Sequence, residues 1–191
     1  MKLIITSHGE TVENSKRIVQ GHLGGRLSKI GKQQAKKVAR RLKKEKLGAI
    51  YSSDLKRAVD TANEIAKFHK DLTVQFDKRL RERFFGKYQG KTYSENWDWK
   101  SIPEGIESDS KMNERVTNFI DDILDKHKND TVLIVSHGGI KKIIYEQKLP
   151  PEKIEAIEKI GNTSITIFEI DKNGNFLPIL VNDTTHLEIN N

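Results

Sequence analysis

The tripeptide Ser-His-Gly occurs twice in the sequence, each time at the end of an apolar segment. The first copy contains His8 and Gly9, and the second contains His137 and Gly138. Each follows a run typical of a buried strand, and the glycine lets the backbone turn sharply and approach a ligand closely. A single histidine at such a place is more often structural. Two at equivalent strand ends, which adjacent parallel strands would bring together, indicate a catalytic or binding site.

A third strand end adds a cation. The apolar run that starts at Ile50 leads into a segment with helical periodicity, and Arg57 falls in the first turn of that helix. A positive charge there is unfavourable in the field of the helix macrodipole, so the position needs an explanation. An arginine beside the free N–H groups of a helix start forms a phosphate-binding corner. Taken alone, the segment would be read as carrying an ordinary surface arginine.

Six short apolar or β-branched runs predict the strands that carry these residues. They cover residues 2–6, 49–53, 72–77, 131–136, 164–170 and 176–181, and the turn-forming residues 171–175 join the last two into a hairpin. Helical periodicity separates the first four, around residues 32–46, 55–66 and 112–124. This alternation predicts an α/β fold, a three-layer sandwich whose mostly parallel central sheet carries helices on both faces. The working loops would then lie at the carboxyl ends of the strands.

Residues 79–111 fit this alternation poorly. The segment contains six aromatic residues among glycines and a proline: Phe84, Phe85, Tyr88, Tyr93, Trp97 and Trp99. We interpret it as a lid or pocket wall over the sheet edge, and a satellite hydrophobic core is an equally good alternative. No repeat of solenoid length and no low-complexity linker is present, so residues 1–191 are expected to form a single domain.

The charge balance limits the classes of partner. The 191 residues include 34 basic and 27 acidic ones, which gives a formal net charge of +7. Acids and bases are interleaved, and the densest basic stretch, residues 32–46, carries an apolar stripe but no aromatic residues for base stacking. A solvated helix face is therefore favoured over a nucleic-acid surface. The charge can still steer small anions towards the protein.

The sequence contains no cysteine, and no apolar run reaches about 18 residues. Disulfides and thiolate chemistry are therefore excluded, and neither a spanning helix nor a signal peptide is expected. We expect a cytoplasmic protein without a membrane partner. It would be a monomer or a homodimer, the latter supported by an exposed edge strand near the C-terminus.

The motifs resemble, in order along nearly the whole chain, those of the histidine phosphatase superfamily, the phosphoglycerate-mutase-like enzymes. His8-Gly9-Glu10-Thr11 with Asn14 is similar to the nucleophile motif, and Leu27-Ser28 with Gly31, Gln34 and Ala35 to the helix start that follows it. Tyr51 to Ala58 with Thr61-Ala62 resembles the arginine motif, and Leu80-Arg81-Glu82 with Phe85-Gly86 and Gly90 the general-acid segment. Ser136 to Gly139 resembles the second histidine motif, and Asn162-Thr163-Ser164 the entry to a late strand. Each match is modest alone, but six in the correct order are highly specific.

The resemblance implies a role for each matched residue. His8 would attack phosphorus through one ring nitrogen, and water would later hydrolyse the phosphohistidine. Glu82 would act as general acid and then as general base, while Arg57 and His137 would stabilise the phosphoryl oxygens. The substrate and its phosphate would be bound by Ser7, Asn14, Gln20, Gly21 and Gly138. The resemblance implies neither a metal ion nor any other cofactor.

One position departs from the family pattern. Family members carry an arginine immediately before the nucleophilic histidine, where it grips the phosphate, and this chain carries Ser7. A hydroxyl brings no charge, and loss of a charge-assisted phosphate contact costs on the order of 2–4 kcal/mol in the transition state. Three explanations compete: another cation compensates, with Arg17, Arg26 and Arg83 as candidates; the site is a weak enzyme or a phospholigand-binding pseudoenzyme; or the serine is engineered.

The favoured function is hydrolysis of a small phosphorylated metabolite, a phosphomonoester, without a metal ion and through a phosphohistidine intermediate. A phosphoglycerate-type mutase is the first alternative, but mutases of this family are typically longer, with more extensive lids than residues 79–111 provide. A catalytically impaired binding module is the second. A metal hydrolase using His8, Glu10 and His137 is disfavoured, because no Asp/His pair supplies the rest of a two-metal site.

Overall fold

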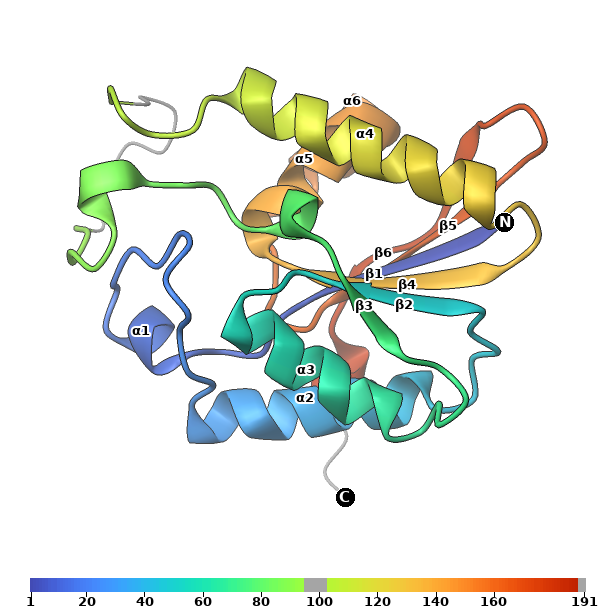
Figure 1. Ribbon diagram of the computed structural model, residues 1–191, viewed down its shortest axis with the longest axis horizontal. Helices are drawn as coiled ribbons and strands as arrows, with labels where there is room; N and C mark the ends of the chain where they lie inside the picture. Colours follow the sequence, from blue (N-terminus) through green and yellow to red (C-terminus); the bar gives the residue numbers. More distant parts are fainter. Residues whose placement is uncertain (95–102, 189–191) are drawn as a thin grey trace.

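Six apolar and β-branched runs form one central sheet. The computed structural model describes residues 1–94 and 103–188. The strands are β1 (Lys2–Ser7), β2 (Ala49–Ser52), β3 (Val74–Phe76), β4 (Thr131–Ser136), β5 (Ile165–Ile170) and β6 (Phe176–Asp183). Their order across the sheet is β3-β2-β4-β1-β5-β6. Figure 1 shows β1 and β4 side by side in the middle of the sheet.

The strand pairing is mostly parallel, as predicted. β1 pairs with β4, β4 with β2, and β2 with β3 in parallel, whereas β5 runs antiparallel to β1 and β6 antiparallel to β5. The register of β1 and β4 aligns Ser7 with Ser136. Because parallel strands end at the same edge of a sheet, the next residues, His8 and His137, leave the sheet together. The two Ser-His-Gly motifs therefore meet at one edge.

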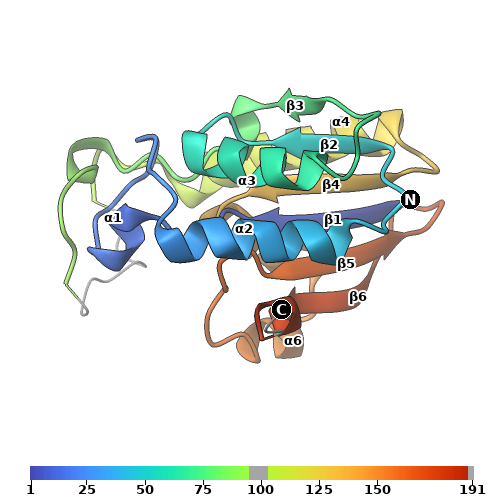
Figure 2. The ribbon, with the colours of Figure 1, turned by 90° about the horizontal axis from the view of Figure 1, so that it is seen from below.

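Helices cover both faces of the sheet, which confirms the predicted three-layer α/β architecture. α2 (Lys29–Leu42) and α3 (Lys56–Ala66) cover one face, and α4 (Asp109–Lys126) and α5 (Gly138–Lys148) cover the other (Figures 1 and 2). Two shorter helices are α1 (Val12–Ser15) and α6 (Pro151–Glu155), and Ile154 of α6 packs against the core on the face covered by α4 and α5. Among the described residues, no helix is long and apolar enough to cross a membrane.

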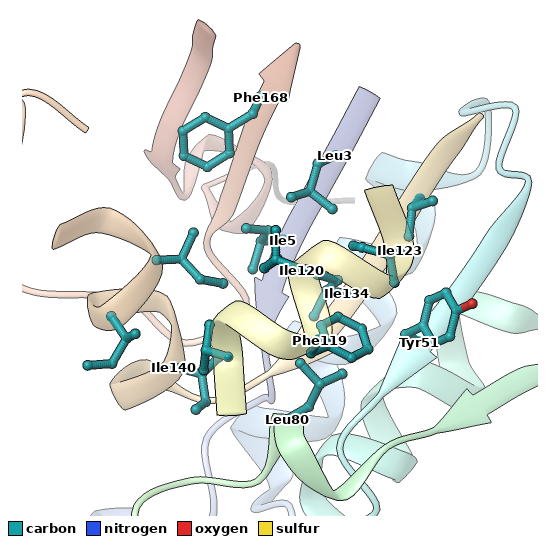
Figure 3. Close-up of a cluster of buried hydrophobic side chains, with 14 of the residues drawn as sticks. Leu3, Ile5, Tyr51, Leu80, Phe119, Ile120, Ile123, Ile134, Ile140 and Phe168 are labelled. Carbon is teal, nitrogen blue, oxygen red and sulfur yellow. The ribbon is translucent and has the colours of Figure 1, made fainter. Parts of the chain in front are cut away.

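The alternation of side chains along β1 divides the core into two clusters. Leu3 and Ile5 pack with Phe119 of α4 and Ile140 of α5, whereas Ile4 packs on the opposite face with residues of α2 and α3. Figure 3 shows the first cluster. All five side chains are fully buried, and burying each contributes about 1.5–3 kcal/mol. The period of two places the side chain of Ser7 on the face of Leu3 and Ile5, towards α4 and α5.

The predicted elements differ from the observed ones mainly at their ends. β3 covers 74–76 instead of 72–77, because Leu72 N–H donates to His69 O in a turn and Asp77 caps the 3₁₀ helix Lys78–Leu80. The helix predicted around 32–46 begins at Lys29, after the N-cap Ser28, and ends at Leu42. Further 3₁₀ turns occur at Gly86–Tyr88 and Thr185–Leu187. Residues 97 and 99, the two tryptophans of the segment 79–111, lie outside the described residues.

Candidate active site

His8 follows β1 directly, and a hydrogen bond fixes the tautomer of its ring. Its Nδ1 lies 2.7 Å from the carbonyl oxygen of Gly9. A carbonyl oxygen only accepts, so Nδ1 carries the proton and Nε2 presents its lone pair. The residue is 6% exposed. The buried ring is therefore oriented as a nucleophile that attacks through Nε2.

The turn after His8 requires a glycine. A Cβ on Gly9 would lie 2.3 Å from the carbonyl oxygen of Gly31 in α2, a distance that real side chains do not reach. The N–H of Gly9 donates to Oγ1 of Thr61 in α3, at 3.1 Å. Gly9 thus lets the backbone beside His8 contact both helices on this face of the sheet.

The second histidine lies against the first. The ring centroids of His8 and His137 are 5.2 Å apart, with 59° between the ring planes. His137 Nε2 lies 2.9 Å from Oγ of Ser53, and His137 Nδ1 is buried without a hydrogen-bond partner among the described residues. Leaving a buried polar atom without a partner is costly, so this nitrogen gains from a hydrogen bond with a ligand. His137 offers one ring nitrogen to a bound group.

Arg57 reaches His8 from the first turn of α3. The residue is 1% exposed, and its Nε donates to His8 Nε2 at 3.2 Å. Nη1 donates to the carbonyl oxygen of Leu23 at 2.6 Å and Nη2 to that of Gly21 at 2.8 Å. These contacts use three of the five N–H groups of a guanidinium, which leaves two for phosphoryl oxygens. The two carbonyl groups hold the guanidinium plane beside His8.

Burial and the charge of Arg57 keep both histidines neutral. Desolvation, reinforced by Arg57, lowers the pKa of His8 from 6.5 to about 3. The same two causes lower the pKa of His137 well below 6.5. Desolvation also lowers the pKa of Arg57 to about 10, which leaves the guanidinium charged at neutral pH. The site thus combines two neutral imidazoles with one cation.

Glu82 lies at the N-terminus of α5. Its Oε2 accepts from the N–H of Gly139 at 3.1 Å, and its Oε1 accepts from the N–H of Arg83 at 2.8 Å. A Cβ on Gly139 would lie 2.1 Å from Oε1 of Glu82, whereas a Cβ on Gly138 would meet nothing within 4 Å. The second glycine of the motif therefore makes room for the carboxylate.

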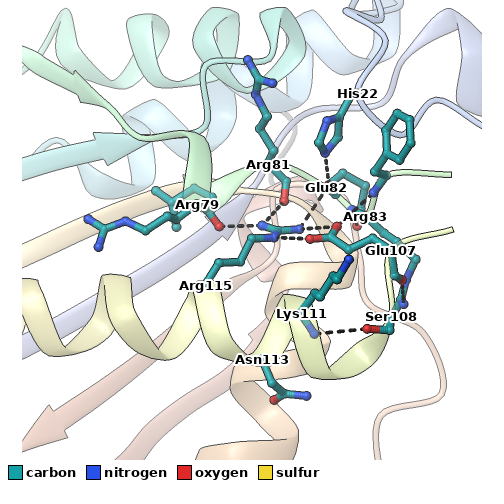
Figure 4. A network of polar contacts seen from close by, with 12 residues as sticks. His22, Arg79, Arg81, Glu82, Arg83, Glu107, Ser108, Lys111, Asn113 and Arg115 are labelled. Carbon is teal, nitrogen blue, oxygen red and sulfur yellow. Dashed lines mark hydrogen bonds and ion pairs between the residues drawn. The ribbon is translucent and has the colours of Figure 1, made fainter. Parts of the chain in front are cut away.

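Arg115 of α4 holds the backbone that carries Glu82. Its Nη1 donates to the carbonyl oxygens of Arg79 at 2.5 Å and Arg81 at 2.6 Å, and its Nη2 to that of Glu82 at 3.3 Å. Glu107 binds the same guanidinium through both carboxylate oxygens, at 2.7 and 2.9 Å. Figure 4 shows these contacts converging on the chain around Glu82. A satisfied, partly buried network of this kind fixes the backbone position of Glu82.

A pocket of about 510 Å³ opens beside these groups. Seven of the nine predicted site residues line it: His8, Asn14, Gln20, Gly21, Arg57, Glu82 and Gly138. His137 is fully buried behind His8. Phe85 and Tyr93, from the described part of the segment 79–111, contribute to the pocket wall. A larger hollow of about 600 Å³, between α6 and β6, contains none of the predicted residues.

Ser7 is placed differently from the other predicted phosphate-binding residues. It does not line the pocket, and its Oγ donates to the carbonyl oxygen of Gly161 at 3.1 Å. The residue is 3% exposed. The hydroxyl is therefore engaged on the α5 side of the sheet, where the alternation along β1 directs it.

Of the three arginines considered as substitutes for a cation at position 7, Arg83 lines the pocket. Its Nη1 donates to the carbonyl oxygen of Glu107 at 2.6 Å, and its Nη2 contacts the carboxylate of Asp109. Arg26 lines a separate hollow next to α1 and α3. Arg17 follows α1 with a φ of 53° and is not among the residues that line the pocket. The guanidinium group of Arg83, which lines the pocket, is thus already paired with a carboxylate.

Several residues of the site were missed by sequence reasoning. Ser53 contacts His137, and Ser136 Oγ donates to the carbonyl oxygen of Leu80 at 2.7 Å. Both serines stand at predicted strand ends, a signal that could have identified them. Lys142 of α5 lines the pocket, and one turn of helix after Gly138 is a position from which it could have been predicted. Arg115 has no such signal, because the carbonyl groups it binds lie 33 to 36 residues away.

The described residues contain no group of three or more His, Cys, Asp or Glu residues arranged to hold a metal ion. Glu10, the carboxylate in the metal hypothesis, accepts a hydrogen bond from Ser28 Oγ at 2.6 Å, at the start of α2. The glutamate thus forms part of the helix cap region instead of facing the two histidines.

Comparison with known proteins identifies the family. The family "Histidine phosphatase superfamily (branch 1)" matches residues 3–184. Phosphoglycerate mutase-like protein 4 of Arabidopsis thaliana is 39% identical, over 98% of this chain and 87% of the relative. The Metal-independent phosphoserine phosphatase of the same plant is 33% identical, over 88% of this chain and 76% of the relative. The structure of Bacillus stearothermophilus YhfR superposes with a TM-score of 0.87 at 31% identity, covering 97% of this chain and 98% of the other. The chain belongs to the histidine phosphatase superfamily.

Proposed function

We propose that the protein hydrolyses small phosphate monoesters by passing the phosphoryl group first to Nε2 of His8 and then to water. The observation that carries this proposal is the fixed tautomer of His8. Its proton is held on Nδ1 by Gly9, which leaves the Nε2 lone pair beside the guanidinium of Arg57. A neutral imidazole with a directed lone pair and an adjacent cation is what attack on a phosphate dianion requires.

The phosphate would be held by groups that surround Nε2 of His8. Arg57 supplies its two remaining N–H donors, and His137 donates from Nδ1 in the neutral tautomer whose Nε2 accepts from Oγ of Ser53. Asn14 uses its Oδ1 to accept from Thr11 in the cap of α1, so a ligand would meet its Nδ2 donors. The amide groups at the start of α5, near Gly138, complete an anion site of the kind that helix N-termini form.

Glu82 would carry the proton transfers. Its carboxyl group would protonate the departing alkoxide when phosphoryl transfer to His8 occurs, and the carboxylate would then deprotonate the attacking water. The position supports this assignment, because the Gly139 N–H holds the carboxylate at the edge of the same pocket as His8. The cycle consumes one water and releases an alcohol and inorganic phosphate.

The substrate class we propose is a small phosphorylated acid of the size of phosphoserine. The pocket is about 510 Å³ in volume, and its lining includes the cationic side chains of Arg83 and Lys142 in addition to that of Arg57. A carboxylate on the substrate would be attracted to these cations. One of the relatives above is named a phosphoserine phosphatase.

The test is an assay of inorganic phosphate released from p-nitrophenyl phosphate and from phosphoserine, with and without EDTA. We expect turnover that EDTA does not change and that His8→Ala abolishes, while His69→Ala, at the far end of α3, leaves it intact. EDTA-sensitive release would indicate a metal enzyme. Transfer of the phosphoryl group to a second hydroxyl instead of water would indicate a mutase. Absence of turnover in the parent, with strong turnover in Ser7→Arg, would indicate a disabled site.

For the setting of this reaction, we propose the cytoplasm and a monomer or homodimer that binds no nucleic acid. The sequence lacks cysteine, and β6 is an edge strand with Leu177 and Ile179 exposed, where a second copy would pair. Light scattering at several protein concentrations and cell fractionation test these two points.

A further inference from the structure

Lys141 is a lysine buried in the α5 layer of the sandwich. Its side chain is fully buried, and its Nζ donates to the carbonyl oxygen of Ser164 at 2.9 Å and also contacts Ser164 Oγ. Lysine is among the residue types least often buried without a carboxylate partner. The burial of the Lys141 ammonium group without a carboxylate partner in the described part of the chain therefore needs a physical explanation.

The ammonium group lies behind position 7. Ser164 Oγ donates to the carbonyl oxygen of Gly161 at 2.8 Å, and Ser7 Oγ donates to the same oxygen at 3.1 Å. Three consecutive hydrogen bonds thus connect Lys141 Nζ to Ser7, which limits their separation to about 9 Å. The side chains of Ser7 and Lys141 also share one face of the sheet, because α5 covers the side towards which Ser7 points (Figure 1).

No carboxylate balances this charge among the described residues. Desolvation is the cause that lowers the pKa of Lys141 from 10.5 to about 7. The titratable groups around it are Tyr145 on its own helix, whose ring lies 5.7 Å from Nζ, and His186. Desolvation raises the pKa of the tyrosine and lowers that of the histidine, so both are neutral when Lys141 is charged. The positive charge of Lys141 has no fixed partner, and a phosphate dianion would supply one.

We propose that Lys141 provides the positive charge that Ser7 does not, and that its ammonium group stabilises the phosphate bound beside His8. This inference rests on the proposed function, since it assigns a further cation to the same phosphate site. Lys141 acts through space and through the Ser164–Gly161–Ser7 contacts, so it is a charge-supplying and positioning residue. At about 10 Å and an effective dielectric constant of about 20, one such charge changes the affinity for each unit of phosphate charge about tenfold.

The first test compares kcat/KM for phosphoserine in the parent and in Lys141→Met as a function of pH. We expect the variant to be about tenfold or more slower near pH 6, where Lys141 of the free protein is charged, and the difference to vanish near pH 9, where it is neutral. Ionisation of the substrate affects both proteins equally and cancels in the ratio. The control Lys172→Met removes one charge from the β5–β6 turn, at the opposite end of β5. Its kcat/KM should equal that of the parent at every pH.

The second test adds Ser7→Arg in both backgrounds. If Lys141 replaces a guanidinium at position 7, Ser7→Arg restores kcat/KM of Lys141→Met. The same substitution raises kcat/KM of the parent much less, because two cations would there compete for one phosphate. Equal effects of Ser7→Arg in both backgrounds would overturn the proposal. A reduction in Lys141→Met by the same factor at every pH would also overturn it, because that is the signature of a purely structural role.

A binding measurement separates this proposal from the proposed function. Calorimetry of inorganic phosphate binding, in two buffers of different ionisation enthalpy near pH 8, reports protons taken up. We expect uptake in the parent and its loss in Lys141→Met, whether or not the protein turns over. Removal of a buried charge is often neutral or stabilising, so the variant should fold. If the variant does not fold, absence of proton uptake in the parent is the result that contradicts the proposal.

Discussion

Arg57 donates from Nε to Nε2 of His8 at 3.2 Å, so the cation and the nucleophile are in contact before any substrate is present. This contact holds the lone pair towards the pocket and contributes to the low pKa of His8. In the proposed reaction, the same N–H would be released to a phosphoryl oxygen when a phosphorus atom approaches Nε2. The site therefore exchanges one hydrogen bond for another and needs little reorganisation.

Arg57→Lys should lower kcat/KM about 100- to 1000-fold although the net charge is preserved. A single ammonium group cannot contact His8 and the carbonyl groups of Gly21 and Leu23 as the guanidinium does. Steady-state kinetics measure the loss, with the exposed Arg40→Lys as the matched control. A variant with nearly the parent rate would contradict the assigned geometry.

Gly139→Ala should lower kcat/KM more than Gly138→Ala, because the added methyl group reaches Glu82 only from position 139. If Glu82 is the general acid, the loss for phosphoserine approaches the roughly 100- to 10,000-fold that such a group contributes. p-Nitrophenolate departs without protonation, and kcat/KM does not include the later hydrolysis of the phosphohistidine, so kcat/KM for p-nitrophenyl phosphate should be affected much less. The ratio of the two substrates is the measurement, and equal losses for both substrates would argue against Glu82 as the acid.

Arg115→Lys should also act through Glu82. The variant keeps a positive charge for Glu107 but cannot contact three backbone carbonyl groups at once. We expect kcat for phosphoserine to fall about tenfold, because a displaced Glu82 loses part of its effect as general acid, and we expect KM to be almost unchanged. A purely structural contribution would lower thermal stability but leave the preference between phosphoserine and p-nitrophenyl phosphate as it is in the parent.

Stability should fall as the pH decreases below about 6.5. In the unfolded chain both histidines of the site bind a proton near their ordinary pKa of 6.5, whereas in the folded protein His8 does so only near pH 3 and His137 well below 6.5. Between these values the unfolded state binds more protons, at a cost of about 1.4 kcal/mol per pH unit for each histidine. Urea unfolding between about pH 7 and pH 5 measures how the free energy of unfolding changes with pH, and this change per pH unit should be smaller for His8→Gln than for the parent. An identical slope would show that His8 is not the residue responsible.

The sequence predicted the architecture because its signals are local. Apolar runs and helical periods placed the strands and helices to within a few residues, and the repeated motif predicted that His8 and His137 would share one edge. The resemblance to the family added Glu82, for which no local signal exists. The shorter β3 follows from Asp77, whose side chain caps the next turn instead of extending the strand.

The remaining features depend on contacts between distant segments. Arg115 binds carbonyl groups that lie more than 30 residues before it in the sequence, and the amphipathic pattern of α4 does not distinguish this arginine from solvated ones. Lys141 similarly follows a glycine pair in a helix whose pattern gives no reason to expect a buried charge. Its environment depends on Ser164, which β5 brings to the end of β1.

The central claim is that His8 carries the phosphoryl group, and trapping that intermediate tests it most directly. The protein would be mixed with ³²P-labelled phosphoserine, quenched in alkali to preserve phosphohistidine, digested, and the labelled peptide analysed by mass spectrometry and by chromatography against the two phosphohistidine isomers. We predict label on the peptide that contains His8, as the isomer phosphorylated on Nε2, and none in His8→Ala. Label on His137, or steady turnover without any labelled histidine, would contradict the account.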